Sequence, residues 1–190
     1  MKTKVPPPIR EIQNWDLRAE PQNMWIKYLD TYKWDFDIYL PTRGINLQRP
    51  LVWTDKQKGE LIYSIYSQRY IPAIYLICPW TTDMTFEVLD GKQRLNAMMG
   101  FLKDEFPVVI NGESFLFSEL PSDYQRFYQS YGPQFRVIFE GNTPFTDDQK
   151  IRWFGLINFA GTPQDEEHMK LLTSQTPHPS NRLGEIGMMG

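Results

Sequence analysis

The chain has little of several residue types on which common enzyme classes depend. Cysteine occurs once, at Cys78, and histidine twice, at His168 and His178. A single cysteine excludes an internal disulfide, and without paired cysteine and histidine spacing we expect no zinc site. Cys78 follows a run of apolar residues, so we interpret it as a buried thiol rather than a nucleophile. The sequence also has no Walker phosphate loop and no Ser/His/Asp order.

An excess of charge of one sign and long hydrophobic runs are also missing. The formal net charge is -3, unlike that of a strongly basic nucleic-acid-binding protein. The net charge does not exclude a local basic patch. The apolar runs are far shorter than the roughly 20 residues that span a bilayer, and no apolar signal-peptide core follows the N-terminus. We therefore expect a cytoplasmic protein with no membrane partner.

What the chain does have is enough apolar material for one domain. Of its 190 residues, 41% are hydrophobic and 15% are aromatic, which argues against disorder. Residues 1–20 contain a Pro-Pro-Pro run and predict an extended N-terminal arm. Residues 21–175 form the predicted domain, and residues 176–190, rich in Pro, Ser and Gly, predict a flexible tail.

Apolar periodicity predicts the elements of this domain, and the spacings of Thr54 with Gln57 and of Thr146 with Gln149 have the capping-box form at two helix starts. Helices are expected at residues 22–32, 55–67, 93–103, 121–131, after Thr146, and at 162–174. Strands are expected at residues 37–40, 73–77, 85–89, 106–110, 114–117 and 134–139. Such irregular alternation is typical of an α+β fold. One helix face is aromatic, and we expect it to pack against the core or a partner rather than to stack bases: Tyr124, Phe127, Tyr128 and Tyr131.

The first candidate site is the strand-to-helix junction Asp90-Gly91-Lys92-Gln93-Arg94. Gly91 lets a ligand approach the backbone, and the amides at a helix start favour anions. Lys92 offers a point charge and Arg94 a planar fork for phosphate oxygens. Gln93 can hold a sugar or orient water, and Asp90 can bind magnesium or accept a proton. The alternative is that Asp90 is an N-cap, Gly91 a turn residue and the next three residues a solvated first turn.

Two further segments place polar residues at element boundaries. Gln48 and Arg49 lie between apolar residues and precede Pro50, an arrangement that can project the arginine into a cleft. The alternative is a surface loop whose Trp53 packs on the core. Asn158 lies near a predicted helix C-terminus, and the alternative there is an ordinary helix-loop-helix.

In this order, the three segments resemble the family called domain of unknown function 262. This is the DGQQR-motif domain at the N-terminus of GmrSD-type restriction enzymes and of the phosphorothioate-sensing enzyme SspE, within the ParB/sulfiredoxin-like superfamily. The matching motifs are Leu47-Gln48-Arg49 with Val52-Trp53, residues 89–95, and Ile157-Asn158 with Gly161-Thr162-Pro163. The resemblance covers about residues 40–175. Leu47 stands where the family often has tyrosine, Lys92 replaces the first glutamine of DGQQR, and we find no His-Asn-His nuclease module.

The resemblance implies a small mixed sheet surrounded by helices and a nucleotide-binding enzyme that hydrolyses a nucleoside triphosphate or transfers a phosphoryl group, as a kinase does. Asp90, Gln93 and Arg94 would be catalytic, with Mg2+ at Asp90. The nucleotide would be bound by Gln48, Arg49, Gly91, Lys92 and Asn158. Possible partners are DNA or a nuclease protein, in bacteriophage, restriction or DNA-modification biology. The alternative is a non-catalytic DNA- or protein-binding regulatory module with the same fold.

Overall fold

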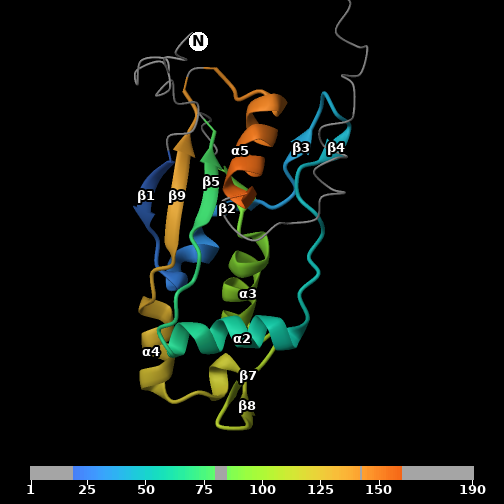
Figure 1. The fold of residues 1–190 in the computed structure, drawn as a ribbon. Helices are drawn as coiled ribbons and strands as arrows, with labels where there is room; N and C mark the ends of the chain where they lie inside the picture. Colours follow the sequence, from blue (N-terminus) through green and yellow to red (C-terminus); the bar gives the residue numbers. More distant parts are fainter. Residues whose placement is uncertain (1–18, 80–84, 142, 160–190) are drawn as a thin grey trace, which may run out of the picture.

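A five-stranded mixed sheet forms the centre of the computed structural model, which describes residues 19–79, 85–141 and 143–159. In sheet order its strands are β1 (Ala19–Asn23), β9 (Gln134–Phe139), β5 (Ile74–Cys78), β6 (Thr85–Asp90) and β2 (Lys33–Asp35). The β5–β9 and β2–β6 pairs are parallel, whereas β1–β9 and β5–β6 are antiparallel. The expected α+β class, with a small mixed sheet and surrounding helices, is confirmed (Figure 1).

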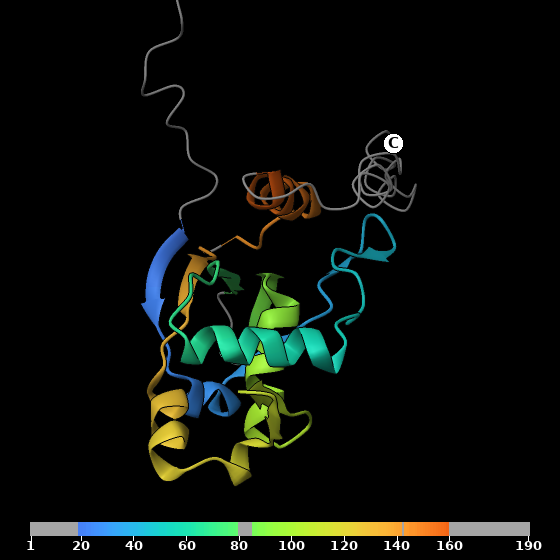
Figure 2. The ribbon, with the colours of Figure 1, turned by 60° about the horizontal axis from the view of Figure 1, so that its bottom comes forward.

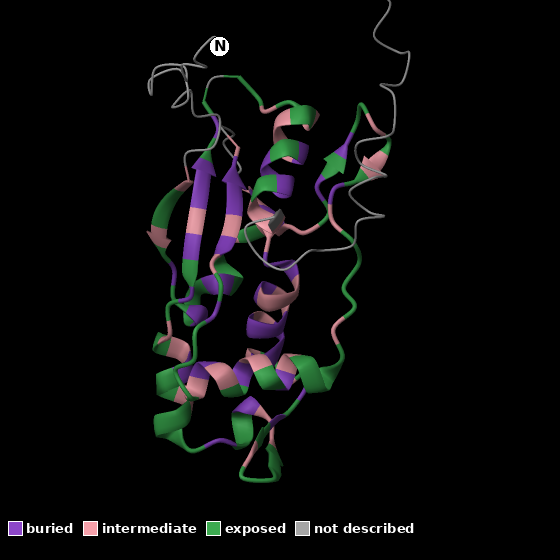
Figure 3. Ribbon diagram, in the orientation of Figure 1, coloured by how far each residue is buried: buried purple, intermediate pink, exposed green. Residues whose placement is uncertain are grey.

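Both faces of the sheet are covered, which explains why its central strand, β5, is almost entirely apolar. Ile74 and Leu76 of β5 join one buried cluster, whereas Ile77 joins the other, because successive side chains of a strand point to opposite faces. The first face is covered by α2 (Asp55–Tyr66), α3 (Lys92–Leu102) and the 3-10 helix η1 (Ile26–Thr31). The second is covered by α5 (Asp147–Phe159) and a hairpin of β3 (Tyr39–Leu40) and β4 (Ile45–Asn46). Figure 3 shows the buried residues gathered on these strands and on α3.

Two groups of elements lie at opposite ends of the long axis of the molecule. Figures 1 and 2 both place α5 and the β3–β4 hairpin at one end. The opposite end holds α4 (Ser122–Ser130) and a second hairpin, β7 (Val108–Ile110) with β8 (Glu113–Phe115). Among the described residues, no helix combines the length and the apolar character needed to cross a bilayer.

Locally specified elements agree with the sequence analysis. Thr54 and Gln57 form the expected reciprocal capping box at the start of α2, and the same pattern occurs between Thr146 and Gln149 before α5. The β7–β8 turn uses positive φ at both Asn111 and Gly112, as two-residue hairpin turns require. Cys78 is buried, and burial, with a smaller effect of Glu140, raises the pKa of its thiol.

The predicted helix at residues 22–32 is wrong. Its first residues belong to β1, which pairs with β9 from Ala19 opposite Ile138 to Asn23 opposite Gln134, and only a short 3-10 helix follows. Pairing with a distant strand outweighs a weak local helical pattern. Similarly, the strand expected at residues 37–40 is reduced to β3, and β2 precedes it. The predicted helix at 162–174 and the tail at 176–190 lie outside the described residues.

Candidate functional site

The junction between β6 and α3 is a sharp turn that only glycine fits. Gly91 is the N-cap of α3, with φ 94° and ψ 13°, in the left-handed region that other residues rarely adopt. A Cβ at this position would lie 2.8 Å from Cγ1 of Ile74 and 3.2 Å from Nη2 of Arg94. Asp90 is the last residue of β6 and does not cap the helix, so that interpretation of Asp90 is wrong.

The loop before α2 is fastened to this junction by two glutamine side chains. Oε1 of Gln93 accepts hydrogen bonds from the amides of Val52 (3.2 Å) and Trp53 (3.3 Å), and its Nε2 donates to the carbonyl of Pro50 (3.0 Å). Gln48 donates to the carbonyl of Val88 in β6. Segments about forty residues apart in the sequence therefore meet, and in this conformation both glutamines position the loop.

The loop and the junction enclose a pocket of about 90 Å³. It is lined by Gln48, Arg49, Trp53, Asp90, Gly91, Lys92, Gln93, Arg94 and Phe154. The structure thus gathers on one concave surface the residues that the sequence pointed to, except Asn158. Asn158 instead donates its Nδ2 hydrogen to the carbonyl of Phe154 (2.7 Å), one turn earlier in α5. The roles of these residues in binding or catalysis stay predictions.

Helix α5 brings Phe154 to the pocket because its buried residues pack in the second hydrophobic cluster, and two ion pairs connect the helix to neighbouring elements. Nζ of Lys150 lies 2.7 Å from a carboxylate oxygen of Glu87 on β6, and Arg43 of the β3–β4 turn lies 2.7 Å from Asp148. Burial raises the pKa of the Glu87 carboxyl, although Lys150 acts in the opposite direction. Sequence reasoning gave Trp53 a place in a family motif, but nothing in the local sequence marked Phe154 as a pocket residue.

The cations of the pocket differ in how they are held. Lys92 is buried, and its Nζ lies 2.5 Å from Oδ1 of Asp37. Nη2 of Arg94 donates to Oδ2 of Asp90 (2.8 Å) and to the carbonyl of Ala73 (3.1 Å). These contacts overturn the interpretation of the first turn of α3 as solvated. Arg49, by contrast, is exposed and forms no ion pair with any residue that the structure describes.

The charges around the pocket favour an anion. Arg49, Lys92 and Arg94 carry three positive charges against the two carboxylates Asp37 and Asp90, which leaves one positive charge in excess. Nε of Arg94 is buried and has no hydrogen-bond partner among the described residues. An unsatisfied buried donor beside a small positive pocket fits a ligand with strong acceptor oxygens.

The dimensions of the pocket limit the size of the group that it can hold. The volume of about 90 Å³ is well below the roughly 300–1,000 Å³ of clefts that bury a drug-sized ligand, so the pocket can enclose a group of the size of one phosphoryl and not a whole nucleotide. Asp90 is the one carboxylate in the lining, and no group of three or more potential metal ligands occurs in the described ranges. Since Mg2+ is usually held by one or two carboxylates together with substrate phosphates, these residues fit a magnesium ion only in company with phosphate.

The site is thus a small pocket with an excess of positive charge at a strand-to-helix junction. Residues 35–174 match the family described as the GmrSD restriction endonuclease, N-terminal domain. This match includes all three motifs and most of the chain, so the chain belongs to that family. No curated protein and no solved structure matched it. Membership of the wider ParB/sulfiredoxin-like superfamily stays a prediction.

The contacts of Gln93 predict a structural cost when its side chain is removed. Gln93→Ala is expected to lower the free energy of unfolding by about 1–3 kcal/mol, because it leaves backbone groups of the loop unpaired. Urea denaturation followed by circular dichroism measures this change. Gln129→Ala, on α4 at the far end of the molecule, is the control. Equal stability of Gln93→Ala and the control would show that the loop is held by other contacts.

The two partners of the Lys92–Asp37 pair should respond unequally to substitution. The Lys92 side chain is 6% exposed and the Asp37 side chain 65%, so only Asp37 can regain water when its partner is lost. Asp37→Ala is expected to cost about 1–3 kcal/mol of unfolding free energy because it strands a buried ammonium group. Lys92→Met should lower the unfolding free energy by less. The same holds for Lys92→Gln, which introduces the glutamine that the family motif has at this position. Urea denaturation of the three variants measures these losses. A larger loss for the Lys92 variants than for Asp37→Ala would show that Lys92 is hydrated.

Proposed function

We propose that this pocket binds the terminal phosphoryl group of a nucleoside triphosphate, and that the domain hydrolyses the triphosphate or transfers this group. The observation that supports the proposal most strongly is the convergence of Arg49, Lys92 and Arg94 on one pocket at the N-terminus of α3. Phosphoryl transfer depends mainly on positioning and charge neutralisation, and the amides of a helix start add to the attraction for an anion.

Each side chain would have a distinct part in this reaction. Arg49, at the exposed side of the pocket, would meet the incoming phosphate first, and Arg94 and Lys92 would neutralise its charge from within. Asp90 would accept the proton of the attacking water or hydroxyl group as its oxygen bonds to the terminal phosphorus, while the bond from this phosphorus to the leaving nucleoside diphosphate oxygen breaks. Mg2+, when bound with the phosphates, would neutralise further negative charge.

Membership of the GmrSD N-terminal domain family connects the chain with restriction biology. We infer that nucleotide binding or turnover serves restriction, DNA modification or their bacteriophage counterparts, through DNA or a nuclease partner protein. A non-catalytic regulatory module is the second candidate. It is favoured by the pairing of Asp90 with Arg94 and by the use of the Gln93 amide to hold the loop, since both leave fewer groups available for chemistry.

Turnover and binding measured separately distinguish these functions. The full chain would be incubated with a panel of nucleoside triphosphates, with and without Mg2+, and phosphate release compared among wild type, Arg49→Ala and the control Arg69→Ala. Release that needs Mg2+ and Arg49 supports the enzyme. Calorimetric binding of a non-hydrolysable analogue without turnover supports the regulatory module. If the chain neither binds nor turns over any of these nucleotides, both proposals are overturned.

A further inference from the structure

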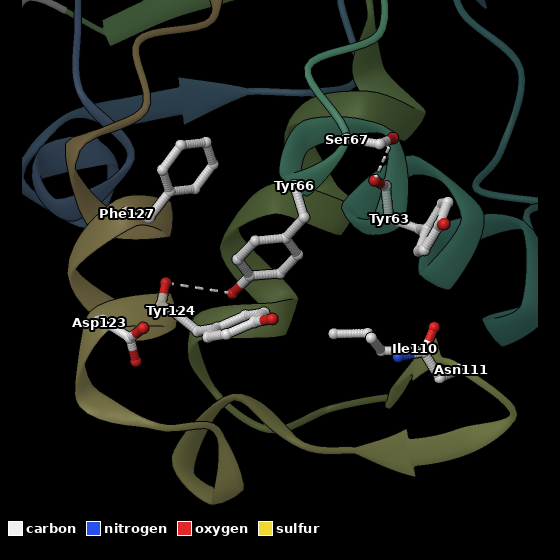
Figure 4. A pocket seen from close by; sticks show the side chains of 8 residues that line it. All are labelled: Tyr63, Tyr66, Ser67, Ile110, Asn111, Asp123, Tyr124 and Phe127. Atoms are coloured by element: carbon white, nitrogen blue, oxygen red, sulfur yellow. Dashed lines mark hydrogen bonds between the residues drawn. The ribbon is translucent and has the colours of Figure 1, made fainter.

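A larger concavity lies at the end of the molecule that holds α4 and the β7–β8 hairpin. Its volume is about 580 Å³, several times that of the phosphate pocket. The walls of this aromatic groove are Tyr63 and Tyr66 of α2, Tyr124 and Phe127 of α4, and Ile110 and Asn111 beside the β7–β8 turn (Figure 4). The hydroxyl of Tyr66 donates to the carbonyl of Tyr124 (3.4 Å), which links the two helices within the groove.

The aromatic residues of α4 divide between the core and this groove. Tyr128 is fully buried and donates its hydroxyl hydrogen to the carbonyl of Met98 (2.9 Å), so it serves the fold. Tyr124 and Phe127 are 39% and 37% exposed and Tyr63 37%, so these three rings of the groove are partly open to solvent although Tyr66 and Arg69 contact them. Clefts between aromatic rings are the surfaces on which polyproline II segments dock, because the preformed proline helix loses little entropy on binding.

A second concavity of about 460 Å³ adjoins the groove and shares Asp123 and Phe127 with it. Lys27 and Arg126 give this part a basic lining. It lies toward the end of β1, since the amide of Ile26 bonds to the carbonyl of Tyr131 just after α4 (3.0 Å). The two concavities form a continuous track from the end of β1 to the C-terminal end of α2, basic at one end and aromatic at the other.

We infer that the aromatic groove is the docking site of the chain's own Pro6-Pro7-Pro8 segment. Residues 1–18 lie outside the described part of the chain and contain this proline run, followed by Ile9, Arg10, Glu11 and, farther on, Asp16. With the prolines between the tyrosine rings, Arg10 meets Asp123. The acidic Glu11 then reaches the basic concavity of Lys27 and Arg126. The sequence order of the segment thus matches the order of charges along the track.

The segment is also long enough to make this connection. The 11 residue steps from Pro8 to Ala19, where β1 begins, reach about 36 Å at ~3.3 Å each. The path to be covered runs along β1, with 5 residues, and α4, with 9, which amounts to about 30 Å at ~3.3 and ~1.5 Å per residue. Docking within one chain therefore needs residues 9–18, which connect the proline run to β1, to be nearly extended.

Paramagnetic relaxation in the full chain tests this inference. A nitroxide is attached to the cysteine introduced by Lys4→Cys, because the native Cys78 is buried and burial raises the pKa of its thiol. We expect loss of the amide signals of Ser67, Asn111 and Asp123, while that of Gly44, in the distant β3–β4 turn, is retained. Replacing all three prolines by alanine in the labelled chain should restore the lost signals.

Two further samples sharpen the outcome. Tyr124→Ala should also restore the signals, whereas Tyr70→Ala, an exposed tyrosine outside the groove, should not. Signals of Ser67 and Asp123 that persist in the labelled wild type, or that remain lost after the proline substitutions, would overturn the inference. Loss that appears when the nitroxide and the isotope label are on different molecules would overturn docking within one chain and assign the groove to a second copy.

Discussion

Arg49→Ala is expected to weaken nucleotide binding by about 1.5–3 kcal/mol, the range for a hydrogen bond to a charged group, or roughly ten- to a hundredfold in Kd. Arg49 lines the pocket but is exposed and holds no described part of the fold in place, so stability should not change. Calorimetric titration with a non-hydrolysable triphosphate measures the loss. Arg49→Lys, which keeps the charge but not the planar fork, should recover only part of the affinity.

Arg94→Ala should weaken binding by a similar amount, but with a cost in stability. The sequence alone suggested a first-turn arginine whose loss would leave folding nearly unchanged. Instead, Arg94 is largely buried and bonds to Asp90 and to the carbonyl of Ala73, so its removal leaves polar groups unpaired. Wild-type affinity in folded samples of both arginine variants would contradict the phosphate-site interpretation.

Gly91→Ala is expected to lower the free energy of unfolding by about 2–5 kcal/mol, the sum of a strained left-handed backbone and an overpacked side chain. The added Cβ would meet Cγ1 of Ile74 at 2.8 Å, and Ile74 is fully buried in β5. Urea denaturation followed by circular dichroism measures the loss.

Gly112→Ala is a matched control for this substitution. Gly112 has a similar positive φ, +86°, but nothing lies within 4 Å of the position that its Cβ would take. The control should therefore show only the backbone part of the cost, and the difference between the two variants isolates the clash with Ile74. Equal losses would mean that β5 moves aside freely, and that the tight junction is not required for the pocket.

The accuracy of the sequence analysis depends on the distance over which each feature is determined. The α2 helix was predictable because Thr54 and Gln57 define its start locally, and the Gly91 junction because turn and helix signals follow one another. The burial of Lys92 was not, since its partner Asp37 lies 55 residues away. Likewise, β1 depends on pairing with β9, more than a hundred residues later, and no local pattern contains that information.

The pocket includes features that the sequence predicted and features that depend on distant contacts. Three ordered motifs indicated that Gln48 and Arg49 would lie beside Asp90, Gln93 and Arg94, and the structure brings these five residues together. The motifs could not predict the hydrogen-bond partners of these side chains. Whether Gln93 faces a ligand or the loop backbone depends on the loop conformation, and that conformation follows from the packing of the whole domain.

Helix α2 joins the loop beside the pocket to the aromatic groove. This helix of 12 residues begins directly after the loop that Gln93 holds and ends at Tyr66 in the aromatic groove, a span of about 18 Å at 1.5 Å per residue. A helix moves as a rigid rod, so a tilt at its loop end displaces the tyrosine rings at its other end. The loop that Gln93 holds and the aromatic groove are thus joined by a single helix, and we expect a rearrangement of the Gln93 contacts to change the width of the groove.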